Sequence, residues 1–201
     1  MKVLMINGSP NKGGCTYTAL SEVQKALSTE GIQSEIVWLG NGPVRDCIGC
    51  GACRNSTGCI FDDDKLSELK AKCLEADGFV FGSPVYYAHP SGRLLSVLDR
   101  LFFSGSAAFK GKPGAAVVSA RRAGTTASID VINKYFSIAQ MPIVGSSYWN
   151  MVHGRKAEEV AEDAEGLQTM RNLGRNMAAM LKGEALPAKG NEYDAWTCFV
   201  R

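Results

Sequence analysis

Four of the seven cysteines lie within thirteen positions, at the spacing C-x2-C-x2-C-x5-C. They are Cys47, Cys50, Cys53 and Cys59. Four thiolates this close in sequence can hold a 4Fe-4S cluster, and the intervening Gly49 and Gly51 let the backbone turn tightly. Zinc also accepts four thiolates, although its ligands usually come as two pairs. A loop of reduced cysteines without metal is the third interpretation, and all three stay open.

A glycine-rich loop near the N-terminus is suited to binding a phosphate. Residues Asn7–Thr16, NGSPNKGGCT, follow an apolar run and precede apolar residues at helical spacing. Such a loop directs backbone N–H groups, and the positive end of the helix dipole, toward one place. It is neither the dinucleotide fingerprint nor the triphosphate loop, because Pro10 replaces a glycine and Gly14 replaces the lysine. The loop therefore indicates a bound monophosphate, or only a helix start capped by Thr16.

Two later loops also carry side chains that suit a cofactor. Pro84, Val85, Tyr86 and Tyr87 provide a rigid turn, an apolar surface and two flat rings, as an isoalloxazine would need. The alternative is a proline turn with tyrosines lying over the core. The segment 119–125 has two adjacent arginines, which could lie beside the pyrimidine end of a flavin or bind a nicotinamide phosphate. The alternative there is a pair of solvated surface arginines.

Apolar periodicity predicts five strands alternating with five helices. This alternation indicates an α/β fold, a three-layer sandwich with a five-stranded parallel sheet. Ligands of such sheets bind beyond the carboxyl ends of the strands, so we expect the three loops to lie together there. The strands are expected at 3–6, 34–39, 78–82, 115–119 and from 142, and the helices at about 19–27, 64–76, 94–102, 129–138 and 162–182.

One domain is expected over residues 1–183, with a cysteine-rich insertion at about 44–63. The tail 184–201 is irregular but rich in aromatic residues, so we expect it to dock on the domain or on a partner subunit. The net charge is only +2 with both signs scattered, which gives no nucleic-acid footprint. We also expect no membrane span and no signal peptide, and clustered cysteines in such a protein indicate redox or metal chemistry in the cytoplasm.

Three segments together resemble a known family. The motifs at 8–16, 82–87 and 111–116 are similar to those of the flavodoxin-like NADPH-dependent FMN reductases. The cysteine run, followed by the acidic residues 62–64, resembles the iron–sulfur flavoprotein branch of that family. The likeness covers about residues 1–144. It implies a flavodoxin-like fold and bound FMN.

The resemblance also implies which residues contact each cofactor. It names no catalytic acid or base, because the flavin carries the chemistry. Cys15 stands where a small polar residue is more usual, which leaves the role of its side chain open. The implied FMN contacts are Ser9, Asn11, Lys12, Cys15, Thr16, Pro84, Val85, Tyr86, Tyr87, Ser119, Arg121 and Gly124, and the implied cluster ligands are Cys47, Cys50, Cys53 and Cys59.

The implied activity is that of an FMN-dependent oxidoreductase. It would take electrons from NAD(P)H and pass them to a quinone, a nitro or azo compound, free flavin or a protein. The family further implies a homodimer or a dimer of dimers. Two alternatives remain: an electron-transfer protein that uses a 4Fe-4S cluster, and a non-catalytic flavin-binding redox sensor.

Overall fold

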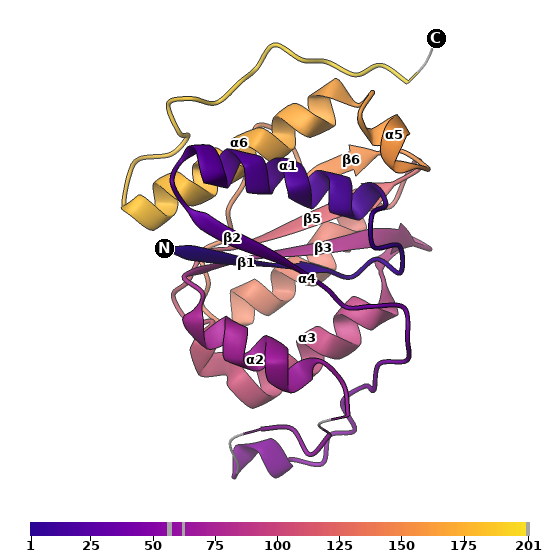
Figure 1. Cartoon of the computed structure of the whole chain (residues 1–201), viewed down its shortest axis with the longest axis vertical. Coiled ribbons are helices and arrows are strands. Elements are labelled where there is room, and N and C mark those ends of the chain that lie inside the picture. The colour runs from indigo at the N-terminus through magenta and orange to yellow at the C-terminus, as the bar shows by residue number, and fades with distance from the viewer. Residues whose placement is uncertain (56–57, 62, 200–201) are drawn as a thin grey trace.

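The computed structural model describes residues 1–55, 58–61 and 63–199. Asp62, part of the acidic run noted above, lies outside these ranges. The described chain forms three layers, with a sheet between two layers of helices (Figure 1). The strands are β1 Lys2–Asn7, β2 Gln33–Trp38, β3 Gly78–Tyr86, β4 His89–Pro90, β5 Gly114–Ala120 and β6 Met151–His153. The α-helices are α1 Cys15–Thr29, α2 Leu66–Glu75, α3 Gly92–Gly105, α4 Thr125–Ile138, α5 Ala157–Val160 and α6 Ala164–Lys182, and the 3-10 helices are η1 Ala52–Arg54 and η2 Ser106–Ala108.

Five strands form a parallel sheet in the order β2-β1-β3-β5-β6, and the short β4 pairs antiparallel with β3. The order reverses between β1 and β3, because the chain proceeds from β1 to β2 on one side and to β3 on the other. Without β4, this is the 2-1-3-4-5 order of flavodoxin-like sheets. The predicted fold class is confirmed.

Successive residues of β1 point to opposite layers, as the pleat of a strand requires. Val3 and Met5 pack in a cluster with side chains of α1 and α6. Leu4 and Ile6 pack in a second cluster with side chains of α2, α3 and α4. Both faces of the strand are therefore buried, which explains why it reads as a continuous apolar run.

The structure corrects two predicted boundaries. The strand expected from Pro142 is limited to one bridge, between Ile143 and Gly114, and regular pairing with β5 resumes only in β6. The irregular segment 144–150 separates the two, and within it Asn150 Nδ2 donates to the carbonyl of Val144 at 3.3 Å. The third strand is four residues longer than predicted, because Tyr86 pairs with His89. The turn expected at Pro84–Tyr87 is thus part of a hairpin.

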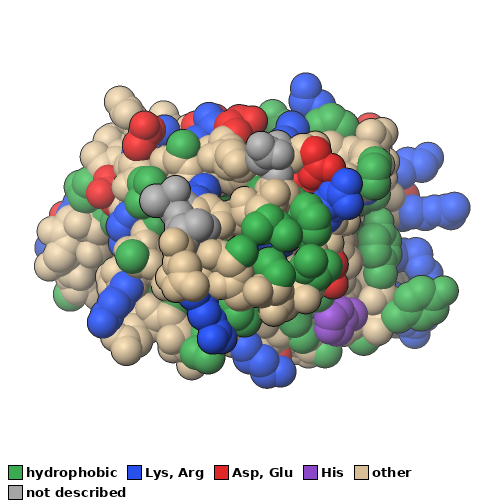
Figure 2. Space-filling model, turned by 90° about the horizontal axis from the view of Figure 1, so that it is seen from below, with side chains coloured by type: hydrophobic (Ala, Val, Ile, Leu, Met, Phe, Trp, Pro, Cys, Tyr) green, Lys and Arg blue, Asp and Glu red, His purple; other side chains and the backbone are tan. Residues whose placement is uncertain are grey.

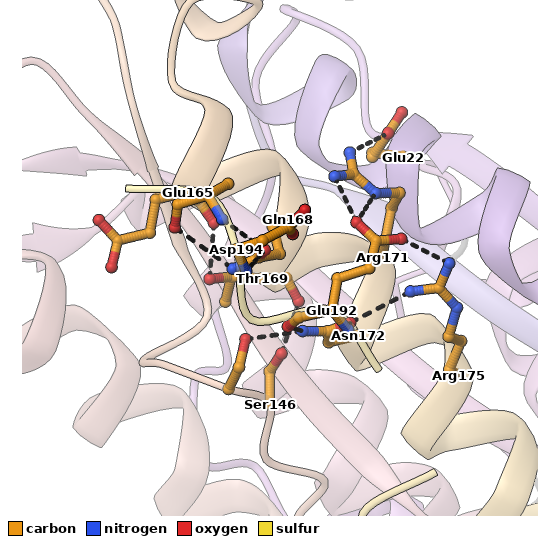
Figure 3. A network of polar contacts seen from close by, with 12 residues as sticks. Glu22, Ser146, Glu165, Gln168, Thr169, Arg171, Asn172, Arg175, Glu192 and Asp194 are labelled. Atoms are coloured by element: carbon orange, nitrogen blue, oxygen red, sulfur yellow. Dashed lines mark hydrogen bonds and ion pairs between the residues drawn. The ribbon is translucent and has the colours of Figure 1, made fainter. Parts of the chain in front are cut away.

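Two segments lie outside the three layers. The insertion between β2 and α2 contains only η1 as regular structure among its described residues, and it projects beyond α2 and α3 (Figure 1). The described part of the tail crosses α6, where Glu192 pairs with Arg171 and Arg175 at 2.7 and 2.6 Å (Figure 3). Among the described helices, none combines the length and apolar character needed to cross a bilayer.

Candidate functional site

Three loops meet at the carboxyl edge of the sheet, because β1, β3 and β5 are parallel neighbours. Ser91 Oγ donates to the carbonyl of Gly8 at 2.8 Å, which joins the first loop to the segment after β3. The hydroxyls of Thr16 and Ser119 lie 2.9 Å apart, which joins the start of α1 to the end of β5. The structure therefore confirms that the three loops come together.

The first loop is shaped by its own polar groups. The Asn11 N–H donates to Ser9 Oγ at 3.1 Å, and the Ser9 N–H donates to Asn7 Oδ1 at 3.0 Å. Trp38 Nε1 donates to the carbonyl of Ser9 at 2.8 Å and fixes the loop from β2. Ser9 is buried, whereas the side chains of Asn11 and Lys12 are exposed at the rim. The loop is thus preformed, with an amide and an ammonium group available at its surface.

The start of α1 has no side-chain cap. Gly14 occupies the N-cap position and has no side chain to accept a hydrogen bond from the first turn. Thr16, considered as a cap in the sequence, is almost fully buried and its hydroxyl pairs with Ser119 instead. The N–H groups of the first turn are therefore left for solvent or for an anion, which the helix dipole also attracts.

Cys15 faces a different part of the site. Its thiol donates to the carbonyl of Gly154, with 3.4 Å between sulfur and oxygen, and so links α1 to the end of β6. Burial is the largest cause that raises the pKa of this thiol, and Glu158 and Glu159 add to it, while its own backbone N–H opposes the change. Cys15 is therefore a neutral thiol at pH 7 and holds two elements together.

The second loop is a strained hairpin that presents two tyrosines. Tyr87 and Ala88 have positive φ values of 51° and 60°, a region that costs an L-residue roughly 1–2 kcal/mol. Tyr86 is half-exposed and Tyr87 fully exposed, whereas Pro84 and Val85 are partly buried below them. Such strain concentrates at functional sites, and here it holds two aromatic rings at the rim.

The third loop packs directly against this hairpin. Gly124 has a φ of +91°, and a Cβ at this position would lie 2.6 Å from Ala88 Cα and 3.0 Å from a methyl group of Val85. Only glycine allows this approach. Arg121 and Arg122 are both exposed, and Arg121 lines a cavity of about 370 Å³ together with His153 and Asp163.

A histidine and an aspartate that the sequence did not single out support this loop. His153 Nε2 lies 3.1 Å from the carbonyl of Arg122, and Asp163 lies 3.8 Å from Nδ1. Asp163 raises the pKa of His153, although burial opposes the change. Burial alone would raise the pKa of Asp163, but the side chain and N–H of His153 and the N–H of Gly166 lower it overall. Asp163 also caps α6, which the sequence analysis did not predict, because it expected the helix to begin at about residue 162.

The four clustered cysteines line one cavity of about 280 Å³ at the other end of the molecule. Figure 2 views this end from below and shows a patch of hydrophobic side chains with basic ones near its margin. Among the described residues, no three His, Cys, Asp or Glu side chains are close enough to hold a single metal ion. A tetrahedral zinc ion needs four sulfur atoms about 2.3 Å from one point. All four thiols line this one cavity, so the donor set leaves a multinuclear cluster, a zinc ion and no metal as alternatives.

Arg100, which the sequence analysis also missed, joins the two ends of the cysteine loop. It is only 1% exposed and forms an ion pair with Asp64. Its guanidinium donates to the carbonyls of Arg45 and Phe61 at 3.2 and 3.0 Å. Burial raises the pKa of Cys59, but the backbone at Phe61 and the adjacent Arg100 side chain, through hydrogen bonding and then charge, outweigh burial, so that pKa is lowered overall. In the sequence, the only signal was an arginine at helical spacing from Val97.

Known proteins share the fold, and some are similar to this chain over most of its length. The family model described as NADPH-dependent FMN reductase matches residues 1–156. An iron-sulfur flavoprotein of Methanocaldococcus jannaschii is 34% identical over 194 residues, covering 90% of this chain and 98% of that protein. An iron-sulfur flavoprotein of Methanosarcina thermophila is 31% identical over 187 residues, covering 90% and 96%. A solved flavodoxin structure from the domain Archaea has a TM-score of 0.61 at 16% identity, covering 90% and 99%, and shows the fold alone.

The likeness therefore extends beyond residue 144, where the sequence motifs ended, and includes most of α6 and the segment before it. The family match, over residues 1–156, includes the three converging loops and the cysteine insertion. The chain belongs to the NADPH-dependent FMN reductase family, in the branch that includes the iron-sulfur flavoproteins.

Proposed function

We propose that this protein is an FMN-dependent oxidoreductase that takes electrons from NAD(P)H and passes them to a quinone, a nitro or azo compound, free flavin or a protein partner. The observation that carries the proposal is the meeting of three loops at the sheet edge, beside a helix start without a side-chain cap. Family membership supports the same reading. FMN supplies the hydride and electron transfer when it is bound, so the chain has to bind, orient and shield it.

Each loop has a separate task in this proposal. The first-turn N–H groups of α1, with Asn11 and Lys12, hold the phosphate of FMN. Ser9, Thr16 and Ser119 are buried and keep the loops in register, and Cys15 ties them to β6. The hairpin at Pro84, Val85, Tyr86 and Tyr87 lies along the flavin ring, with Gly124 allowing the third loop to approach. Arg121 provides a permanent positive charge for the flavin or for the nicotinamide phosphate.

The cysteine cavity favours a second, compatible role as an electron-transfer protein. We infer that Cys47, Cys50, Cys53 and Cys59 hold a 4Fe-4S cluster that exchanges single electrons with FMN or with a protein partner. All four line the same cavity, and both relatives named above are called iron-sulfur flavoproteins. The alternatives of zinc or no metal become outcomes of the experiment below, as does a non-catalytic sensor.

Assembly and location complete the proposal. We infer a homodimer or dimer of dimers, which is supported by exposed aromatic side chains at Tyr148 and Trp149 on the sheet edge beside β6. Aromatic side chains are enriched at protein–protein interfaces. We place the protein in the cytoplasm, because four cysteines clustered in one short segment suit metal or redox chemistry in a reducing compartment.

Anaerobic purification tests the two roles together. Visible spectra, with iron and zinc analysis, are recorded before and after adding NADPH. We expect bound FMN that bleaches within seconds, and iron at about four atoms per chain. Cys50→Ser should lose the iron and keep FMN, because the two sites use separate elements. Cys198→Ser, on the tail, is the matched control and should keep both.

Each contrary result removes a named part of the proposal. Colourless protein that does not bind added FMN refutes the flavin site. Flavin that binds but is not reduced by NADPH, with no turnover of any acceptor, favours the sensor. Zinc, or no metal, in wild-type protein refutes the cluster. Loss of both iron and FMN in Cys50→Ser shows that the insertion supports the whole fold.

A further inference from the structure

Arg100 is buried on α3, where a charged side chain needs strong partners. It is the largest fully buried side chain in the described chain, and it lies between Val97 and Leu101 on the buried face of the helix. Removing a guanidinium from water is costly unless its hydrogen bonds are replaced. The structure shows which of them are replaced.

Four of the five N–H groups of this guanidinium have partners. The two terminal nitrogens donate to the carbonyls of Arg45 and Phe61 and to both carboxylate oxygens of Asp64. An arginine has a fifth N–H, on Nε. In the part of the chain that the structure describes, Arg100 Nε is buried and has no hydrogen-bond partner.

The residue that carries this unpaired donor, Arg100, lines the cysteine cavity. Arg100 lines the same cavity of about 280 Å³ as Cys47, Cys50, Cys53 and Cys59. A buried donor without an acceptor is unfavourable, so it points to an acceptor that the cavity receives. Four of the polar side chains among the described lining residues are thiols, and thiolate or sulfide sulfur accepts a hydrogen bond from an arginine.

We propose that Arg100 donates its Nε–H to a sulfur atom of the cluster held by these four cysteines, and that this contact raises the reduction potential of the cluster. The inference rests on the proposed cluster and goes beyond it, because Arg100 is not a ligand. Reduction adds negative charge to a cluster, and hydrogen bonds to its sulfur atoms stabilise that charge. Asp64 orients the guanidinium and balances its charge in the loop.

The test is a redox titration followed by electron paramagnetic resonance on anaerobically purified protein, with iron and FMN contents measured for each sample. Arg100→Gln removes the charge and the Nε donor. We expect the ratio of oxidised to reduced cluster, at the wild-type midpoint, to rise at least tenfold, which is 59 mV for one electron. Arg100→Lys keeps the positive charge but loses the planar set of guanidinium donors. Its ratio of oxidised to reduced cluster should therefore lie between those of the wild type and Arg100→Gln.

Two further variants guard against misfolding and general charge effects. Arg100→Gln combined with Asp64→Asn avoids leaving a buried carboxylate unpaired, and it should show the same direction of change. Arg54→Gln removes an exposed arginine that lines the same cavity, and it should change the ratio less than threefold.

The outcomes separate this inference from the cluster itself. Wild-type protein without iron overturns both. Wild-type protein with iron, together with a double variant that holds the same iron at an unchanged midpoint, overturns the role of Arg100 alone. An equal shift in Arg54→Gln also overturns it, because any nearby positive charge would then suffice.

Discussion

At the scale of single residues, the sheet edge proposed to bind FMN depends on close contact between two backbone segments. Gly124 brings the third loop against Ala88, and that hairpin itself contains two residues in the left-handed region. Neither feature adds buried apolar area. Both make sense if the loops must present a preformed surface to a flat ligand, since strained backbone is retained where function requires it.

A matched pair of glycine variants tests this contact. Gly124→Ala and Gly111→Ala both place an L-residue at positive φ, +91° and +75°, but only Gly124 has neighbours within 4 Å. Both should lose roughly 1–2 kcal/mol from the backbone conformation. Overpacking against Ala88 should cost Gly124→Ala about 1–3 kcal/mol more and weaken FMN binding. Urea unfolding and flavin fluorescence measure the two effects, and equal values for the two variants would contradict the account.

At the scale of elements, α6 serves as the platform for the tail. Asn172 accepts from the N–H of Glu192 at 2.8 Å, and Gln168 Oε1 accepts from the N–H groups of Asp194 and Ala195 at 2.9 Å (Figure 3). Arg171 also pairs with Glu22, which ties the network to α1. The tail is therefore held by polar contacts, with little apolar burial, and should respond to pH.

Glu192 gives this network a defined pH dependence. Arg171 is the main cause that lowers the pKa of Glu192, with Arg175 adding to it and burial opposing it. Because its pKa is lowered, the charged Glu192 carboxylate stabilises the docked tail at pH values above its ordinary pKa of 4.5. This stabilisation is lost as the pH falls through the lowered pKa that Glu192 has in the docked state. Glu192→Gln should lose about 1 kcal/mol of tail docking at pH 7, and the loss should vanish at low pH.

Amide hydrogen exchange in residues 191–197 measures this effect, as the ratio of the exchange rates of the variant and the wild type at each pH. The expected ratio is about fivefold at pH 7 and close to one in acid. Glu184→Gln, at an exposed site on the same tail, is the control and should leave the exchange rates unchanged. A ratio for Glu192→Gln that does not depend on pH would show that the ion pairs do not hold the tail.

At the scale of the whole molecule, the sequence predicted the layers and the converging loops but not the long-range partners. Alternating apolar periods sufficed for the parallel sheet, because its central strands are buried on both faces. The last strand was misplaced because residues 142–144 are more apolar than β6, which has only three residues. Arg100 and His153 were missed because their partners, Asp64 and Asp163, are brought to them by tertiary packing.

The molecule thus separates two tasks. The carboxyl edge of the sheet carries the three loops proposed for FMN, while the insertion below α2 and α3 carries the cysteine cavity (Figure 1). The first of these is the central claim, because the family, the topology and the uncapped helix all point to the same edge. Its distinguishing feature is recognition of a phosphate, and not only of a flat ring.

Comparing the affinities of the apoprotein for FMN and for riboflavin tests that claim most directly. The two ligands share the ring and differ only in the phosphate, which the first turn of α1 should bind through several charge-assisted hydrogen bonds. We predict that FMN binds at least about 100-fold more tightly, a difference of roughly 2.7 kcal/mol, by quenching of flavin fluorescence. Equal affinities would contradict a phosphate at the start of α1.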